Sequence, residues 1–415
     1  MSTAGRIPCN PLQQIFRFAE LYPPAQLCYK PHRSRLLTRV QILNSPPPTL
    51  VQAIENQDTV FSSAFSVLRD AISARAFPSA SIAVTQAGKL AALKSFGHFT
   101  YEDELEVTPA TLFDIASLTK PVSTTTMAML LYERGLLELD APIIGVVPEF
   151  MSDAGGEPDS RRRDVTFHML LAHASGLPAY EKLFLKEHSC DDLLRAAFTT
   201  SLSSDPGTRA EYSDIGFIIL GAALERMAGE SLDAFCQREV FGPLAMTRTT
   251  FNPPAGTRAE IPPTANDRTF RKKIIQGEVQ DENAYVLGGV AGHAGLFSSA
   301  EDLAHFAHIM LYGGAPILRP ETIALFTLRE SAPPGTTRTL GWDTPSTPSQ
   351  SGRFFGPASF GHLGYTGTSL WIDPERQLSI TLLTNRTWPD CAHQAIKQIR
   401  PKFHDAIVEA LNEEA

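Results

Sequence analysis

A serine and a lysine stand three residues apart, at Ser117 and Lys120. Residues three or four apart on a helix share a face, so the hydroxyl and the amine are expected to meet. A serine hydroxyl is a weak nucleophile at neutral pH, and a lysine can activate it if the pKa of the amine is lowered. A helix N-terminus would also favour an oxyanion at this serine. The spacing predicts a nucleophilic serine, although Ser-x-x-Lys by itself occurs by chance in many proteins.

The elements that must position this pair are predicted from the spacing of apolar residues. A long apolar helix is expected to follow the serine, over 122–131, and to end near Gly135. Other helices are expected over 58–72, 167–176, 215–227, 231–241 and 299–311, strands over 81–85 and 89–94, and a hairpin of strands over 368–372 and 378–383. The C-terminal apolar stripe predicts a last helix that is kinked or interrupted at Pro401.

This order of elements predicts the fold class. Strands lie near both ends of the chain and helices lie between them, without an alternating strand and helix rhythm. We therefore expect an α+β, two-lobed fold, in which an antiparallel sheet is flanked by N- and C-terminal helices and joined to a mostly helical lobe. Residues 1–55 are an unassigned N-terminal extension and a candidate for disorder, residues 56–415 form the domain, and the helical lobe is inserted at roughly 122–285.

Two central segments are unusual. Residues 252–283 are rich in proline and charge and predict a long irregular excursion, of the kind that often borders a site. Residues 287–297 hold too many glycines for an ordinary strand, which indicates backbone passing close to another group, such as a substrate.

The composition limits the classes of partner. The chain has 415 residues and a net charge of −9, which argues against nucleic acid as a partner, and no apolar run reaches the length of a membrane span. The N-terminus has no clear signal peptide, so a cytoplasmic location is expected, or a periplasmic one if the true start lies elsewhere. Five scattered cysteines predict free thiols, and His168 and His173 are expected to be structural. We expect no metal and no cofactor, and the oligomeric state is not readable.

Three separated motifs then stand in order. They are Ser117-x-x-Lys120, Tyr212-Ser-Asp214, and His362-Leu-Gly364 followed by Tyr-Thr-Gly. With these motifs the chain resembles the serine β-lactamase and penicillin-binding superfamily, from about residue 58 to the C-terminus. It is most similar to the class C-like branch, which includes class C β-lactamases, D,D-carboxypeptidases, D-aminopeptidases and family VIII carboxylesterases. The resemblance implies a β-lactamase/transpeptidase-like fold.

The resemblance also implies roles for the motif residues. Ser117 would attack a carbonyl carbon and form an acyl-enzyme, and either Lys120 or Tyr212 would be the base, a choice that the sequence leaves open. The backbone N–H groups of Ser117 and Tyr365 would form the oxyanion hole. Asp214, His362, Gly364 and Asn385 would lie on the substrate side.

Two departures from the family motifs bear on the substrate. Asp214 replaces an asparagine and cannot donate an amide hydrogen bond, but it can pair with Lys120. His362 and Leu363 replace the Lys-Thr pair that holds a substrate carboxylate in the family. We therefore expect a hydrolase of small esters, with a small-molecule ester or amide as its partner. The alternatives are a D,D-carboxypeptidase, penicillin-binding protein or class C-like β-lactamase acting on D-amino-acid peptides or β-lactams, and a non-enzymatic binding protein, against which the intact motifs argue.

Overall fold

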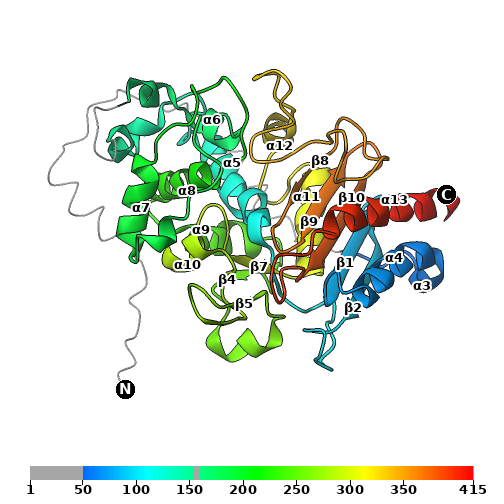
Figure 1. Cartoon of the computed structure of the whole chain (residues 1–415). Coiled ribbons are helices and arrows are strands. Elements are labelled where there is room, and N and C mark those ends of the chain that lie inside the picture. The colour runs from blue at the N-terminus through cyan, green and yellow to red at the C-terminus, as the bar shows by residue number, and fades with distance from the viewer. Residues whose placement is uncertain (1–49, 153–158, 415) are drawn as a thin grey trace.

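The computed structural model describes residues 50–152 and 159–414, and a five-stranded antiparallel sheet forms its centre (Figure 1). In order across the sheet, the strands are β2 (Lys89–Gly97), β1 (Ser79–Gln86), β10 (Leu378–Thr384), β9 (Ser369–Asp373) and β8 (Phe360–Leu363). Gly88, at a φ of +77°, makes the tight turn between β1 and β2. Strands from both ends of the chain thus share one sheet, as the sequence predicted.

Helices cover both faces of this sheet. Helices α4 (Ser62–Ser73) and α13 (Ile396–Glu414) pack against each other on one face, and α11 (Ala300–Leu311) contacts β1 and β10 on the other. Successive side chains of a strand point to opposite faces, and the packing follows this rule. In β1, Ile82 and Val84 belong to the apolar cluster under α4 and α13, whereas Ala83 belongs to the cluster that contains α11.

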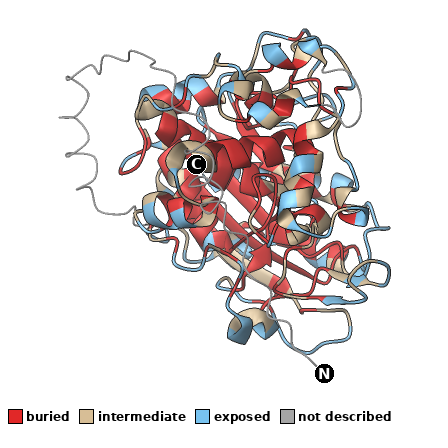
Figure 2. Cartoon of the chain, turned by 90° about the vertical axis from the view of Figure 1, so that its left-hand side faces the viewer, coloured by how far each residue is buried: buried red, intermediate tan, exposed pale blue. Residues whose placement is uncertain are grey.

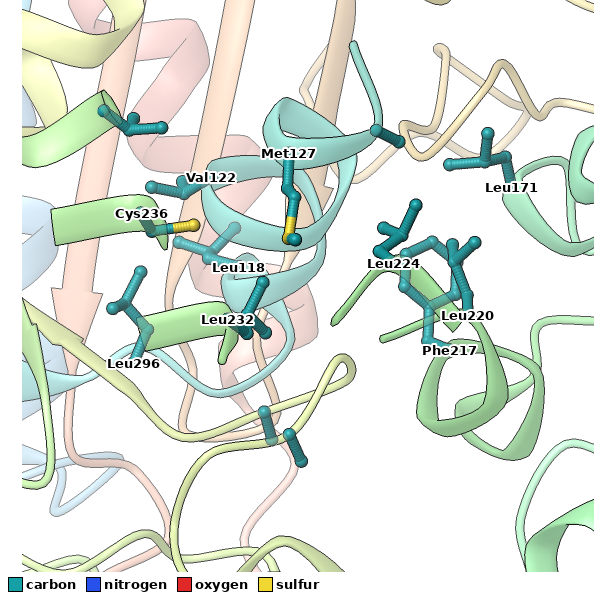
Figure 3. Packing of buried hydrophobic residues seen from close by; sticks show 14 of the residues in the cluster. Leu118, Val122, Met127, Leu171, Phe217, Leu220, Leu224, Leu232, Cys236 and Leu296 are labelled. Carbon is teal, nitrogen blue, oxygen red and sulfur yellow. The ribbon is translucent and has the colours of Figure 1, made fainter. Parts of the chain in front are cut away.

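The remaining elements form the second lobe and the connections (Figures 1 and 2). Helix α3 (Gln57–Val60) is not part of this lobe and packs with α4 and α13. The other helices are α5 (Thr126–Glu133), α6 (Phe167–Leu171), α7 (Cys190–Thr199), α8 (Asp214–Ala228), α9 (Leu232–Cys236), α10 (Glu282–Val286) and α12 (Pro320–Thr327). The short strands are β3 (Phe113–Asp114), β4 (Thr250–Phe251) and β7 (Leu296–Ser298) in one sheet, and β5 (Ala265–Asp267) and β6 (Lys273–Ile275) in another. The lobe packs its apolar side chains around α5 and the turns before it. Leu118, Val122 and Met127 lie there between Cys236 and Leu232 on one side and Phe217 and Leu220 of α8 on the other (Figure 3).

The structure corrects two expectations about single residues. Helix α13 is continuous through Pro401, which is the sixth of its nineteen residues, so of the expected kink or interruption at this proline, the interruption is wrong. Cys236 and Cys391 are free thiols as expected, but Cys190 is disulfide-bonded, so the free-thiol prediction is wrong for this cysteine.

Of the predicted N-terminal extension, residues 1–55, the first 49 residues lie outside the described part of the chain. Within the described part, Gln52 pairs with Leu90 beside β2, so the chain is already attached to the sheet edge there. In neither described range is there a helix long and apolar enough to cross a membrane, or a group of three His, Cys, Asp or Glu side chains that could hold a metal ion.

Candidate active site

Ser117 lies in a tight, strained turn at the junction of the two lobes. A 3-10 turn (Ala116–Leu118) leads directly into a π-helical segment (Lys120–Thr125) and then α5. Ala116 has a φ of +47°. Residues other than glycine rarely adopt this backbone conformation, and it is often found at functional sites. The carboxylate of Asp114 holds this turn, because its Oδ1 accepts the Ala116 N–H at 2.8 Å and its Oδ2 accepts the Gln280 N–H at 2.6 Å.

The three residues predicted to be catalytic meet at one atom, the Ser117 hydroxyl oxygen. Lys120 Nζ donates to Ser117 Oγ at 3.1 Å, and Tyr212 OH donates to the same oxygen at 2.7 Å. Lys120 also pairs with Asp214 Oδ1 at 2.6 Å, as the sequence suggested it could. We call Ser117, Lys120, Tyr212 and Asp214 the Ser117 group.

Helix α8 positions the two members that lie far from Ser117 in the sequence. Ser213 is its N-cap, and the Ser213 hydroxyl accepts the Gly216 N–H at 2.9 Å. Tyr212 and Asp214 stand on either side of this cap, and both reach the Ser117 and Lys120 side chains. The helix start therefore fixes both residues at once.

The charges within the Ser117 group follow from its burial and its one carboxylate. Burial lowers the pKa of Lys120, but the neighbouring Asp214 carboxylate and Tyr212 more than offset this effect, so its pKa is raised above the ordinary value. Burial, together with the negative charge of Asp214, raises the pKa of Tyr212 to about 12. At neutral pH the resting site therefore holds a lysine ammonium and a neutral phenol. Either Lys120 or Tyr212 must therefore lose a proton before that residue can accept the proton of Ser117.

Asp214→Asn should move the rising limb of the pH–rate profile to lower pH. The general base acts only when deprotonated, and the Asp214 charge raises the pKa of both candidates, so its removal lowers the pH at which either becomes a base. The measurement is kcat against pH on an ester substrate. Asp140→Asn, at an exposed carboxylate outside the Ser117 group, controls for the change in net charge. If the rising limb stays at the same pH, the Asp214 charge does not control the pKa of the general base.

The predicted oxyanion donors lie on adjacent segments. Gly364 passes so close to the Ser117 turn that an added Cβ would stand 2.6 Å from the Ile115 carbonyl oxygen. Thr366 Oγ1 donates to the Asp114 carbonyl at 2.7 Å, and Thr368 Oγ1 donates to that of Ile115 at 3.0 Å. These bonds fix the segment after β8 against the nucleophile turn. The Tyr365 N–H has no acceptor within the described residues, so it is available for an oxyanion.

Two histidines and an arginine surround the Tyr212 ring. The ring centroids of His173 and His362 lie 4.7 Å and 6.0 Å from it, and the Arg338 guanidinium carbon lies 5.4 Å from it. His173 Nδ1 accepts the Ser213 N–H at 3.0 Å, so this histidine is a structural support of the α8 start. Burial and the nearby cations Lys120 and Arg338 hold the pKa of His362 well below its ordinary value, so its imidazole is neutral at pH 7.

The glycine-rich run approaches helix α8 and Lys120. Gly292 is packed so tightly that an added Cβ would stand 2.1 Å from the Phe217 carbonyl oxygen. The next residue, His293, accepts a hydrogen bond from Lys120 Nζ on its carbonyl oxygen at 3.0 Å. The His293 ring pairs with Asp281 at 2.8 Å, which anchors this backbone. The close approach predicted from the glycines is thus present: Gly292 makes it to helix α8, and the next residue, His293, contacts the Lys120 side chain.

Asn385 lies apart from the Ser117 group. Its Oδ1 accepts from Ser79 Oγ at 2.8 Å, and its Nδ2 donates to the carbonyls of Phe99 and Pro263. The side chain is buried, and none of these contacts involves a residue of the Ser117 group. The amide therefore links β1 to its surrounding loops, and this geometry gives no support to the predicted substrate contact.

Comparison with known proteins identifies the family of this chain. The family model described as Beta-lactamase matches residues 61–400. An N-acetylmuramyl-L-alanine amidase of Bacillus subtilis (strain 168) is 32% identical over 350 residues, which are 75% of this chain and 78% of that protein. A putative D-alanyl-D-alanine carboxypeptidase of Escherichia coli (strain K12) is 31% identical over 323 residues, 71% of this chain and 74% of that protein.

Solved structures share the fold. EstCE1, a hydrolase with promiscuous acyltransferase activity, superposes with a TM-score of 0.69 at 21% identity, covering 84% of this chain and 99% of EstCE1. A class C beta lactamase from Rhodobacter sphaeroides gives a TM-score of 0.65 at 20% identity, covering 84% and 99% of the two chains. The predicted α+β fold is confirmed by these neighbours. The chain belongs to the beta-lactamase family and is a serine hydrolase of the β-lactamase and penicillin-binding superfamily.

Proposed function

We propose that this protein hydrolyses small neutral esters through an acyl-enzyme formed on Ser117. In this reaction the deprotonated member of the Lys120–Tyr212 pair takes the proton of Ser117 Oγ, which bonds to the ester carbonyl carbon, and the N–H groups of Ser117 and Tyr365 stabilise the oxyanion. The alkoxide leaving group takes a proton from the Lys120–Tyr212 pair. Water then gives a proton to the same pair and attacks the acyl-enzyme carbonyl carbon. The bond from this carbon to Ser117 Oγ breaks, the serine takes the proton back and the acid product is released.

The uncharged side chains of His362 and Leu363 in the third motif carry this proposal. A carboxylate clamp needs a fixed cation, because hydrogen bonds to charged groups contribute about 1.5–3 kcal/mol each. His362 is buried and its Nδ1 bonds to the Leu363 carbonyl oxygen at 2.8 Å, so one of its ring nitrogens is already used. Its low pKa leaves the ring uncharged, and Leu363 offers no hydroxyl. A neutral ester requires neither group.

A second candidate function is hydrolysis of D-amino-acid peptides that end in a carboxylate. Arg338 favours this candidate, since its guanidinium is a cation that lies over the ring of Tyr212, a hydrogen-bond partner of the nucleophile. Its ion pair with Asp343 is long, at 3.5 Å. The name of the putative D-alanyl-D-alanine carboxypeptidase relative points in the same direction.

A substrate panel on the purified protein distinguishes the two functions. We expect kcat/KM for p-nitrophenyl butyrate to exceed that for benzylpenicillin and for a D-Ala-D-Ala peptide. The double variant His362→Lys with Leu363→Thr should raise activity on the carboxylate-bearing substrates more than on the ester, because it restores a cation and a hydroxyl.

Arg338→Gln is the matched test of the second candidate. If the wild type prefers the peptide and this substitution removes the preference, the peptidase function replaces the esterase function. Under the esterase proposal, Arg338→Gln leaves the ratio of ester to peptide turnover nearly unchanged. Faster hydrolysis of penicillins than of esters by the wild type would also overturn the proposal.

A further inference from the structure

A pocket lies behind β8, on the side away from Tyr212. Its volume is about 350 Å³, and its walls include Leu363, Gly364, Arg386, Ile396, Lys397 and Arg400. Because adjacent strand residues face opposite ways, His362 points to the Tyr212 ring while Leu363 packs with the apolar cluster of α4 and α13. The pocket therefore adjoins the segment that carries the oxyanion donor, but it is separate from the Ser117 group.

Arg386 contributes one cation to this pocket. Its Nε donates to the Tyr365 carbonyl oxygen at 2.8 Å, and its guanidinium carbon lies 4.7 Å from the Tyr365 ring centroid. Nη1 donates at 3.4 Å and 3.3 Å to the carbonyls of Cys391 and His393. Within the described residues Nη2 has no acceptor, so this buried side chain keeps donors free for a ligand.

Arg400, on the first turns of α13, contributes a second cation. Its Nη1 donates to Gln350 Oε1 at 2.8 Å, and its Nη2 donates to the carbonyls of Gly367 and Thr368. The side chain is buried, and its Nε is a buried nitrogen without a hydrogen-bond partner in the described part of the chain. An orphaned buried donor of this kind is rare in folded proteins and calls for an explanation.

The cations of this pocket have no carboxylate partner. No ion pair is formed by Arg386, Lys397 or Arg400 with any Asp or Glu in the described ranges. Burial, and to a smaller extent the neighbouring charge of Arg386, lowers the pKa of Arg400 to about 9. Buried charges are usually paired, so a bound anion would relieve the cost of burying these cations.

We propose that this pocket binds a compact oxyanion, a carboxylate or a phosphate group. The planar guanidinium groups of Arg386 and Arg400 suit the oxygens of such an anion, and the Lys397 ammonium at the mouth adds a point charge. Because Arg386 also bonds to the Tyr365 carbonyl, an anion held here is linked to the oxyanion segment through one side chain.

Calorimetric titration of the full-length protein with inorganic phosphate tests this proposal. Phosphate should bind saturably at one site, and sodium chloride at equal ionic strength should not reproduce the heat. Lys397→Glu should weaken phosphate binding roughly tenfold, because it replaces a cation at the pocket by an anion. Lys402→Glu, an exposed lysine of the same helix outside the pocket lining, is the matched control and should bind as the wild type does.

Two results would overturn the proposal: no saturable binding beyond that of chloride, or equal weakening by the Lys397 and Lys402 substitutions. Arg386→Gln should abolish binding, and its melting temperature checks that it folds. If Arg386→Gln does not fold, the comparison of Lys397→Glu with Lys402→Glu still tests whether the pocket binds phosphate. Since the titration does not depend on turnover, its outcome is distinct from that of the proposed esterase activity.

Steady-state kinetics identify the source of the anion. If the pocket receives the carboxylate of a substrate, phosphate raises KM for a carboxylate-bearing ester and leaves KM for a neutral ester unchanged. If it receives a free ion, phosphate changes kcat for both esters alike. Either result supports the pocket, whereas no effect on either ester together with no calorimetric binding contradicts it.

Discussion

Ser117→Ala should lower kcat by about 10⁴-fold or more, because removing the nucleophile of a serine hydrolase leaves only the contribution of binding and the oxyanion hole. Ser117 is half-buried, and within the described residues its hydroxyl bonds to Lys120 and Tyr212 only, so it contributes little packing. The measurement is kcat on p-nitrophenyl butyrate. The melting temperature of the variant should stay close to that of the wild type.

A fluorophosphonate probe gives an independent readout of the same nucleophile. The probe should label the wild-type protein at Ser117 and should leave Ser117→Ala unlabelled. Ser123→Ala is the matched control, since this hydroxyl lies one to two turns further along the same helix and contacts Cys236. It should keep both labelling and turnover. Full activity in Ser117→Ala, or labelling at a different serine, would overturn the acyl-enzyme mechanism.

The local part of the site could be predicted from the sequence because short spacings determine it. Ser117 and Lys120 lie on one helical face at a separation of three, and their contact at 3.1 Å follows from that spacing alone. Tyr212 and Asp214 lie nearly a hundred residues away, so no periodicity places them beside Ser117. Their position was predicted from the resemblance to a family, and it depends on α8 entering the lobe at its Ser213 cap.

Residues that support the site through their backbone or ring were not predicted. His293 contacts Lys120 through its backbone carbonyl oxygen. Every residue type has this oxygen, so the identity of the residue at position 293 does not predict the contact. His173 was expected to be structural, and its ring packs on Tyr212 at a distance that only the folded chain reveals. Asn385 shows the opposite case, because a residue chosen from the family pattern lies in a buried hydrogen-bond network away from Ser117.

The buried ion pair at Lys120 also explains why this lysine must be tested with care. Breaking a buried pair by removing one partner costs about 3–5 kcal/mol, because the other charge is left uncompensated. Lys120→Ala would leave Asp214 in that state, and the loss of activity could then reflect unfolding. Lys120→Met, combined with Asp214→Asn, removes both charges and keeps the volume of the side chain. Tyr212→Phe removes only the phenol oxygen.

Lys120→Met and Tyr212→Phe, each in the Asp214→Asn background, should both lower kcat by about 10³-fold, and the variant with both changes should lose little more. Groups that act as one unit are not additive, because removing either already stops the proton transfer from Ser117. Both side chains bond to the same oxygen, Ser117 Oγ, so they share one proton path. The measurement is kcat for the four proteins on one ester, with melting temperatures to show that each is folded at the assay temperature. If the two losses multiply to about 10⁶-fold, Lys120 and Tyr212 act independently, and the shared path is wrong.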